Sequence, residues 1–438
     1  MQPINKVLPR SAGVTAVVIA LLLAGIASAE DTPPRLEEMW RIIQEQQREI
    51  ERLKARLAET DRKLEAADQR LRVADEKIEA ADKKIEAADQ KIEATGEMME
   101  QVAAKEPAAA SSEGWWTKTS LGGYGELHYN GGKKDEIDFH RFVLYFSHAF
   151  TDQLRFHSEV ELEHALAGDG EPGEIELEQA YVEYDFTGRL QGKAGLFLLP
   201  VGILNETHEP PTFFGVERNI VETAIIPTTW WEGGLAGRAI LGRGFSTDLA
   251  FHSGLNVATT GSNAYLPRGG RQKVSEAVAK NPAVTGRLKW TGMPGIELAL
   301  TAQYQDDVTQ GAQGVDALLL ETHAAIRRGP WALRALYARW NFGGDQPKVL
   351  GRDRQYGWYV EPGYILGTRF GDVGAFARYA EVDNSAGDAA PSKFKETTIG
   401  LNYWPHPQVV FKLDYQFQDA PPEVETDNRI NLGLGLMF

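Results

Sequence analysis

The chain has 438 residues, of which 42% are hydrophobic, and it carries a net charge of −16 at pH 7. This length exceeds what one ordinary soluble domain needs, and the acidic balance argues against a nucleic-acid-binding protein, which would carry a basic face. The absence of cysteine excludes disulfides, thiolate metal sites and a lipid anchor on an amino-terminal cysteine.

Residues 1–29 have the pattern of a secretory signal peptide. Lys6 and Arg10 precede a short apolar run, residues 14–26, and an Ala-Ser-Ala cleavage site ends at Ala29. The alternative is an uncleaved anchor, but the run is shorter than the roughly 20 residues that a spanning helix needs. We therefore expect an exported protein.

Residues 30–104 are predicted to form an α-helical coiled-coil stalk. Apolar residues recur at every seventh position from Leu36 to Ile92, and a second series starts three residues later at Met39. From residue 63 the flanking positions alternate between Lys or Arg and Asp, charges that can pair between neighbouring helices. A solvated single helix is the alternative, because the many alanines of the second series bury little area. Residues 105–115 are predicted to be a flexible linker.

From residue 116 the hydrophobic period changes from seven to two. Residues 409–418, 155–163 and 296–305 each place apolar side chains on one face and polar ones on the other, as a membrane-spanning strand requires. We predict an all-β domain over residues 116–438, a 16-stranded antiparallel transmembrane β-barrel. The expected strands begin near residues 118, 135, 154, 174, 190, 234, 245, 281, 295, 314, 331, 354, 372, 393, 408 and 428.

The connections between these strands alternate between short and long. An even number of strands puts both ends of the barrel on one side, so we expect the stalk and the short turns in the periplasm. Aromatic residues near the short turns are typical of a barrel's interfacial girdle: Phe150, Phe186, Phe245, Trp290, Trp331 and Trp404. A large soluble sandwich is the alternative, but its outer faces would carry fewer aromatic residues.

The last strand, from residue 428, alternates without a break and ends on Phe438. Its apolar face is formed by Ile430, Leu432, Leu434, Leu436 and Phe438. This ending resembles the closing strand of bacterial outer-membrane barrels, in which a terminal Phe is part of the assembly signal. The resemblance implies a location in the outer membrane of a Gram-negative type of cell, with lipid and lipopolysaccharide as neighbours.

One connection, residues 201–231, is long enough to require a function. We predict that it narrows a pore, and its candidate constriction residues are Glu206, His208, Glu209, Glu217, Arg218 and Glu222.

Around this loop the chain resembles the phosphate-selective porin O and P family. The matching segments are residues 195–202, 214–218, 356–364, 377–379 and 400–415. The resemblance implies a homotrimer of sixteen-stranded barrels that pass anions, guided by basic residues along the lumen.

The sequence leaves the ion selectivity open, because the expected lumen charges are mixed. The lumen-facing candidates are Arg141, Arg155, Glu159, Glu161, Lys193, Arg287, Lys289, Arg378, Lys412 and Arg429. Rings of one charge sign select ions by sign, whereas acidic residues still outnumber basic ones after residue 105.

The first hypothesis is therefore a trimeric diffusion porin for small ions and solutes, phosphate among them by resemblance. The second is a structural protein that tethers the outer membrane to peptidoglycan through its stalk. A barrel enzyme is the third and weakest, because the histidines are scattered and none sits in a nucleophile motif. We expect no catalytic residues, no cofactor and no bound metal; His157 with Glu159, Glu161 and Glu163 is interpreted as a solvated wall.

Overall fold

The computed structural model describes residues 40–41, 43–63, 65, 68–69, 72, 114–422 and 424–438. The chain divides into two units, Met1–Ser111 and Ser112–Phe438, which are considered separately. The predicted signal peptide, most of the predicted stalk and the linker up to residue 113 lie outside the described residues.

In the first unit, residues 43–63 are helical. The heptad residues on this helix are all exposed: Ile43 by 48%, Ile50 by 50%, Leu53 by 54% and Leu57 by 64%. Within the described residues, nothing covers this apolar stripe. No helix in the described part of the chain is long and apolar enough to cross a membrane.

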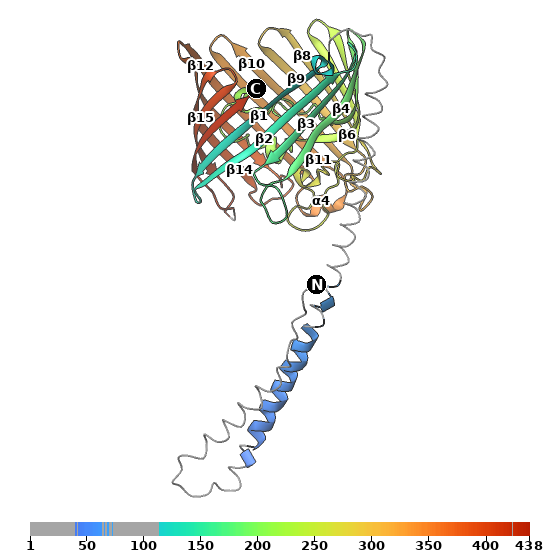
Figure 1. Cartoon of the computed structure of the whole chain (residues 1–438), viewed down its shortest axis with the longest axis vertical. Helices are drawn as coiled ribbons and strands as arrows, with labels where there is room; N and C mark the ends of the chain where they lie inside the picture. Colours follow the sequence, from blue (N-terminus) through green and yellow to red (C-terminus); the bar gives the residue numbers. More distant parts are fainter. Residues whose placement is uncertain are drawn as a thin grey trace, which may run out of the picture. The chain divides into compact units, whose positions relative to one another are not determined.

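The second unit is a closed barrel of sixteen antiparallel strands, as predicted (Figure 1). Each strand pairs with its neighbours in sequence, and β1 pairs with β16 to close the barrel. The strands are β1 (Thr119–Gly131), β2 (Glu136–Ala149), β3 (Leu154–Glu163), β4 (Ile175–Thr187), β5 (Leu190–Leu198), β6 (Trp231–Gly242), β7 (Phe245–His252), β8 (Ala283–Met293), β9 (Ile296–Gln305), β10 (Ala317–Arg328), β11 (Trp331–Phe342), β12 (Arg354–Thr368), β13 (Gly371–Asp383), β14 (Lys393–His406), β15 (Val409–Asp419) and β16 (Arg429–Met437). Every predicted strand start lies within three residues of the observed one.

Five short helices lie outside the strands. They are η1 (Trp115–Lys118) before β1, η2 (Pro210–Thr212) and α3 (Val221–Ala224) between β5 and β6, η3 (Pro267–Gly270) between β7 and β8, and α4 (Asp345–Val349) between β11 and β12. Except for η1, all of them occupy long connections at the same end of the barrel.

The barrel wall is apolar outside and polar inside. On β15, Phe411 and Leu413 are 49% and 40% exposed, whereas the alternate residues Asp414 and Gln416 are almost fully buried. The same inversion holds on β16, where Leu432 is exposed and Asn431 is buried. A soluble core would show the opposite arrangement, so the outer face is built for an apolar surrounding.

The assignment of one residue, Trp404, to the expected aromatic girdle is wrong. Phe150, Phe186, Phe245 and Trp331 are exposed on the barrel's outside. Trp404 instead points inward, where its ring lies 6.0 Å from that of Phe214 and its Nε1 donates to the carbonyl of Pro211 at 3.1 Å. The strand's register decides this, since Trp404 shares a face with the buried Asn402.

Candidate functional site

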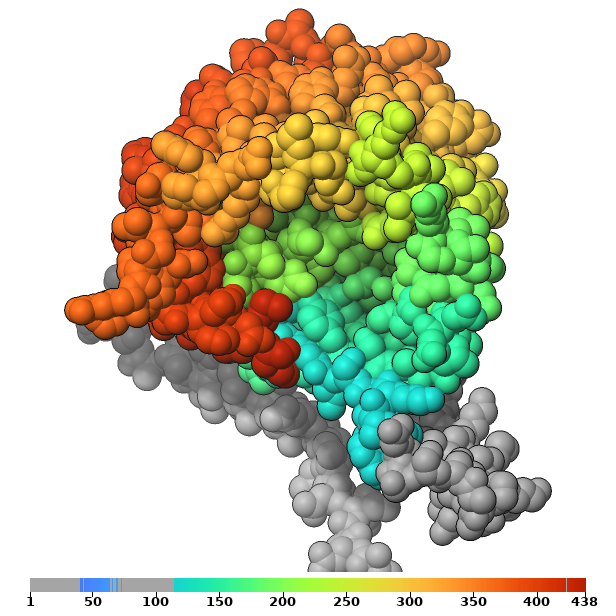
Figure 2. All heavy atoms as spheres, turned by 90° about the horizontal axis from the view of Figure 1, so that it is seen from above, coloured from blue at the N-terminus to red at the C-terminus, as the bar shows by residue number. Residues whose placement is uncertain are grey.

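The connection between β5 and β6, residues 199–230, folds into the barrel; we call it the inner loop. Its backbone is held by lumen-side groups of distant strands. Asp414 accepts from the amide of Val216 at 2.6 Å, and Trp340 Nε1 donates to the carbonyl of Ile225 at 2.9 Å. Figure 2 looks into the barrel and shows a hollowed opening with light-green atoms, the colour of this region, inside it.

Glycines on the lumen side of β16 let the inner loop lie directly against the wall. A Cβ on Gly435 would overlap Pro210, and one on Gly433 would stand 3.2 Å from Val216. Glycine in a strand often marks such a close approach of another backbone. The alternating terminal strand therefore has a second role: its outer face is apolar and its inner face seats the loop.

A buried carboxylate fixes the shape of the inner loop. Glu222 is fully buried and accepts from the amides of Ile203 and Leu204, both at 2.6 Å. It also accepts from Asn219 Nδ2 at 3.0 Å and from the hydroxyl of Tyr359 at 2.8 Å. The prediction that Glu222 faces the constriction is therefore wrong, because its carboxylate is buried and accepts hydrogen bonds from the loop itself and from Tyr359 of β12.

Apolar packing fills part of the lumen beside this carboxylate. Val221, Ile225 and Trp230 of the inner loop pack with Leu319 and Trp340 of the wall in one buried cluster. Residues of the connection between β7 and β8, 253–282, join the same cluster; we call this segment the second loop. The passage through the barrel is thus narrowed by two loops rather than one.

Three arginines of these loops make no ion pair within the described residues. Arg218 Nη1 donates to Thr229 Oγ1 at 2.8 Å, and Arg268 Nη1 donates to the carbonyls of Thr223 and Thr228 at 3.1 and 3.2 Å. Arg271 donates to the carbonyl of Thr229. Because guanidinium groups stay protonated at neutral pH, these three side chains form a positively charged cluster.

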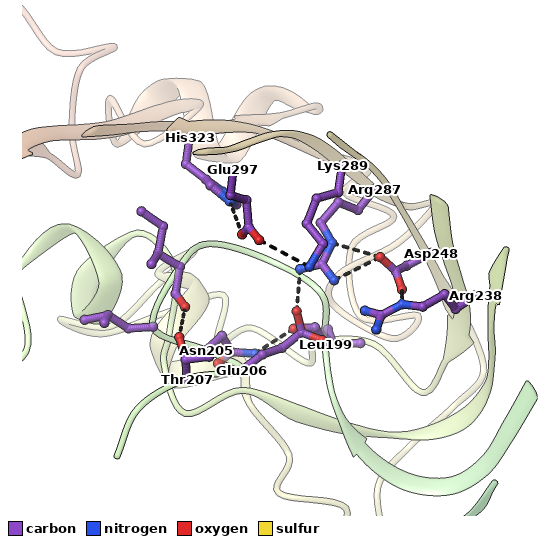
Figure 3. Close-up of polar contacts among 12 residues, drawn as sticks. Leu199, Asn205, Glu206, Thr207, Arg238, Asp248, Arg287, Lys289, Glu297 and His323 are labelled. Carbon is purple, nitrogen blue, oxygen red and sulfur yellow. Dashed lines mark hydrogen bonds and ion pairs between the residues drawn. The ribbon is translucent and has the colours of Figure 1, made fainter. Parts of the chain in front are cut away.

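Other lumen cations are neutralised by a ladder of charges along β6 to β10 (Figure 3). Arg238 and Arg287 share Asp248, at 2.6 and 2.9 Å, and Arg287 also pairs with Glu206 of the inner loop. Lys289 Nζ lies 3.5 Å from Glu297, which also approaches His323 at 3.3 Å. The ladder therefore ties the inner loop to the wall through Glu206.

The remaining predicted lumen residues lie on the inner strand faces, and most are paired. Arg141 contacts Glu126 at 2.7 Å and Glu161 at 3.2 Å, both almost fully buried. The other contacts are Arg155 with Glu183 (2.7 Å) and Asp185 (2.8 Å), Arg378 with Glu361 (3.0 Å), and Arg429 with Gln416 (2.8 Å). Two lysines make no ion pair within the described residues, and their ammonium groups lie against aromatic rings: Lys193 lies over Tyr181 and Phe197, and Lys412 lies 3.5 Å from the centre of the Phe213 ring.

The remaining loop candidates serve different ends. His208 is buried and lies 3.3 Å from Glu159 and 3.7 Å from Glu178, so it anchors the loop to the wall instead of lining an aperture. Glu217 accepts from Asn130 Nδ2 at 2.8 Å and contacts His128 at 3.3 Å. Glu209 precedes η2, and its carbonyl accepts from the amide of Thr212 at 2.9 Å.

Sequence reasoning missed Arg268 and Arg271, because it took candidate constriction residues only from the connection over residues 201–231. Their spacing of three residues in a glycine-rich, basic segment was the available signal. The sequence does not reveal that these two arginines lie near Arg218, because their proximity depends on how the two loops pack inside the barrel.

Two cavities border the inner loop. One of about 660 Å³ is lined by its residues 211–214, by Arg327 and Arg334, and by the short turn before β9. Another of about 250 Å³ is lined by residues of β4 to β7, Lys193 among them, and by Glu206 of the inner loop.

Comparison with known proteins gives one relative and several structural neighbours. No family model matches the chain. A protein of Aquifex aeolicus (strain VF5), described as uncharacterized, is 30% identical over 345 residues, which are 70% of this chain and 77% of the relative.

The solved structures that resemble the chain are porins and outer-membrane channels. OmpF of Salmonella typhi and an anion-selective porin of Comamonas acidovorans each have a TM-score of 0.53 and 13% identity; each match covers 73% of this chain, and 97% and 99% of those chains. The channel DcaP of Acinetobacter baumannii has a TM-score of 0.50 and 13% identity, covering 73% of this chain and 97% of its own. At such identities the likeness shows a shared fold. The chain has the porin fold and belongs to the same protein family as the Aquifex aeolicus relative.

Proposed function

We propose that this protein is a diffusion porin of the outer membrane that passes small anions. The observation that carries the proposal is the cluster of Arg218, Arg268 and Arg271, which make no ion pair within the described residues, while Arg141, Arg287 and Arg378 are paired with carboxylates. Fixed charges of one sign at a narrow point select ions by sign. The solved structure described as an anion-selective porin has the same fold, which supports the proposal.

The outer membrane is the proposed location because the barrel presents an apolar surface to its surroundings. Lipid and lipopolysaccharide then surround the barrel, and small anions are the solutes that permeate it. Phosphate belongs to this class, in line with the resemblance of residues 195–202 and 214–218 to phosphate-selective porins.

Reversal potentials in planar bilayers test this function. Under a tenfold KCl gradient we expect a potential of the sign that chloride permeation gives, and a further shift when phosphate replaces chloride. If the folded protein gives no conductance, the proposed porin function is refuted. A potential of the opposite sign would leave a porin that prefers cations.

We further propose that the stalk holds three copies together. The exposed stripe of Ile43, Ile50, Leu53 and Leu57 supports this, because a coiled coil covers such a stripe with neighbouring helices. Deleting residues 35–104 is expected to lower the mass of the detergent-solubilised assembly or its resistance to dissociation, while each barrel still conducts. An unchanged assembly after the deletion would place the contacts between copies on the barrels.

The same deletion tests the hypothesis that the stalk tethers the outer membrane to peptidoglycan. A tether predicts a looser envelope, measured as sensitivity to detergent in cells, with conductance intact. Cells that withstand detergent equally well with the shortened chain would exclude that role.

A further inference from the structure

Two histidines and an aspartate converge on the lumen side where β2 begins and β3 ends. His140 Nδ1 and His164 Nδ1 both face Asp138 Oδ2, at 3.1 and 2.8 Å. One ligand atom from each of the three residues lies within 4.8 Å of the other two. The side chains are 20–34% exposed, so the cluster can be reached from the aqueous lumen.

A β-bulge brings His140 into this cluster. The pairing of β1 with β2 shifts between Glu126, which opposes Arg141, and His128, which opposes Asp138. Strict alternation would send the neighbours His140 and Arg141 to opposite faces. With the bulge, Arg141 pairs with Glu126 while the ring of His140 stacks on that of His128, at 4.8 Å between centres and 15° between planes. Bulges commonly re-aim a side chain in this way next to functional sites.

The backbone conformation after β3 places His164 in the cluster. His164 and Ala165 have φ of 53° and 57°, the left-handed region that residues other than glycine seldom adopt. The amide of His164 donates to the carbonyl of His140 at 3.1 Å, which fixes the two histidines relative to each other. The conformation thus brings the second imidazole to the same carboxylate oxygen.

The donor set suits a divalent transition metal ion. Imidazole nitrogens select Zn²⁺, Cu²⁺ or Ni²⁺ over Mg²⁺ or Ca²⁺, which prefer oxygen ligands. Three protein ligands with water in an open position is a common zinc arrangement. Without a metal, each Nδ1 must carry a proton to donate to Asp138, and an ion would replace those protons. Glu126 and Glu217 add negative charge nearby; both contact His128, and Glu126 also pairs with Arg141.

We propose that Asp138, His140 and His164 form a binding site for a divalent transition metal ion, with Zn²⁺ as the reference ion. The site is linked to the inner loop, because His128 stacks on His140 and contacts Glu217 at 3.3 Å. If the protein is a porin, as proposed above, a bound ion should change its conductance through this contact and through its own charge.

Calorimetry on the full, untagged protein in detergent tests the site itself. After treatment with a chelator, we expect one Zn²⁺ per chain and no comparable binding of Mg²⁺. His140→Ala and His164→Asn should each weaken Zn²⁺ binding by more than the roughly 10- to 100-fold that changes outside the ligand shell cause. Asparagine tolerates the left-handed backbone at residue 164, which keeps the loop's shape. His406→Ala, at an exposed histidine outside the cluster, is the matched control and should bind as the wild type does.

Absence of Zn²⁺ binding by the wild type, or equal binding by all variants, would overturn the site. Bilayer recordings then separate this result from the proposed function. Conductance that Zn²⁺ changes in the wild type but not in His164→Asn supports the link to the inner loop, and an equal response in both refutes it. If the protein binds Zn²⁺ but conducts no ions, the proposed porin function is refuted and the metal site is retained.

Discussion

Replacing Glu222 with glutamine is expected to release the inner loop and to raise the single-channel conductance. The carboxylate accepts from four donors, two of them backbone amides at 2.6 Å. Glutamine removes the charge and turns one acceptor oxygen into an NH₂ group that faces donors. Hydrogen bonds to a charged group contribute about 1.5–3 kcal/mol each, and a buried donor left without a partner costs about 1–3 kcal/mol. The loop therefore loses several kcal/mol of local stability, while the strands keep their pairing.

Tyr359→Phe is the matched control, because it removes only one of the four donors and leaves the carboxylate in place. We expect a small effect from Tyr359→Phe and a larger, noisier conductance from Glu222→Gln, with an unchanged β-sheet signal in circular dichroism. Identical single-channel traces for Glu222→Gln and the wild type would show that the loop does not depend on this carboxylate.

Gly202 supports the same interpretation of Glu222. It has φ of +73°, and a Cβ there would stand 2.7 Å from Glu222 Oε1. The chain thus combines a left-handed backbone with space for the carboxylate at one position. A side chain at residue 202 would disturb both, so this part of the loop is organised around Glu222.

The strands could be predicted because their cause is local. Each segment has a period of two with one apolar face, as in residues 409–418, and every second connection is a short turn. Pairing with neighbours in sequence then leaves little choice of topology. The same local logic failed at Trp404, where an aromatic residue near a short turn faces inward, because it has a partner in the inner loop.

The inner loop's packing could not be predicted, because its partners are far away in the sequence. Glu222 looks like a pore residue in a polar loop, yet its phenol partner is 137 residues further along the chain. A usable signal was present in glycines on the inner faces of the strands. A Cβ on Gly363 would lie 2.6 Å from the ring of Phe214, and Gly433 and Gly435 lie beneath Val216 and Pro210. Missing side chains at lumen positions mark the path of a loop inside a barrel.

The charges inside the barrel also needed the register before they could be interpreted. The sequence shows a mixture, which leaves the selectivity open. The structure divides the mixture into cations that are neutralised, such as Arg287 between Asp248 and Glu206, and cations that make no ion pair within the described residues. The three loop arginines belong to the second group, as do Lys193 and Lys412. The acidic excess therefore does not by itself decide which ions the passage favours.

Changing Arg218, Arg268 and Arg271 together to glutamine is expected to remove the preference for anions. One charge about 6 Å from an ion in water contributes roughly 0.7 kcal/mol, so three contribute up to about 2 kcal/mol. Because each 1.4 kcal/mol is a tenfold change, chloride permeability should fall and potassium permeability should rise, each by at most roughly 30-fold. The ratio of chloride to potassium permeability should therefore fall by several-fold or more. Screening shortens the reach of these charges to about 3 Å at 1 M salt and about 10 Å at 0.1 M, so reversal potentials near 0.1 M should show the larger change.

Two further variants separate the local charge from other effects of this triple substitution. Arg189, Arg243 and Arg369 lie exposed in short turns, and changing them to glutamine alters the net charge by the same amount outside the lumen. That variant should keep the wild-type potential, and so should lysine at residues 218, 268 and 271, which keeps the charge but alters the hydrogen bonds between the two loops. If the two glutamine variants shift the potential equally, net charge rather than the loop cluster governs the current. If the lysine variant loses the preference as well, the geometry of the loops, and not the positive charge they carry, sets the selectivity.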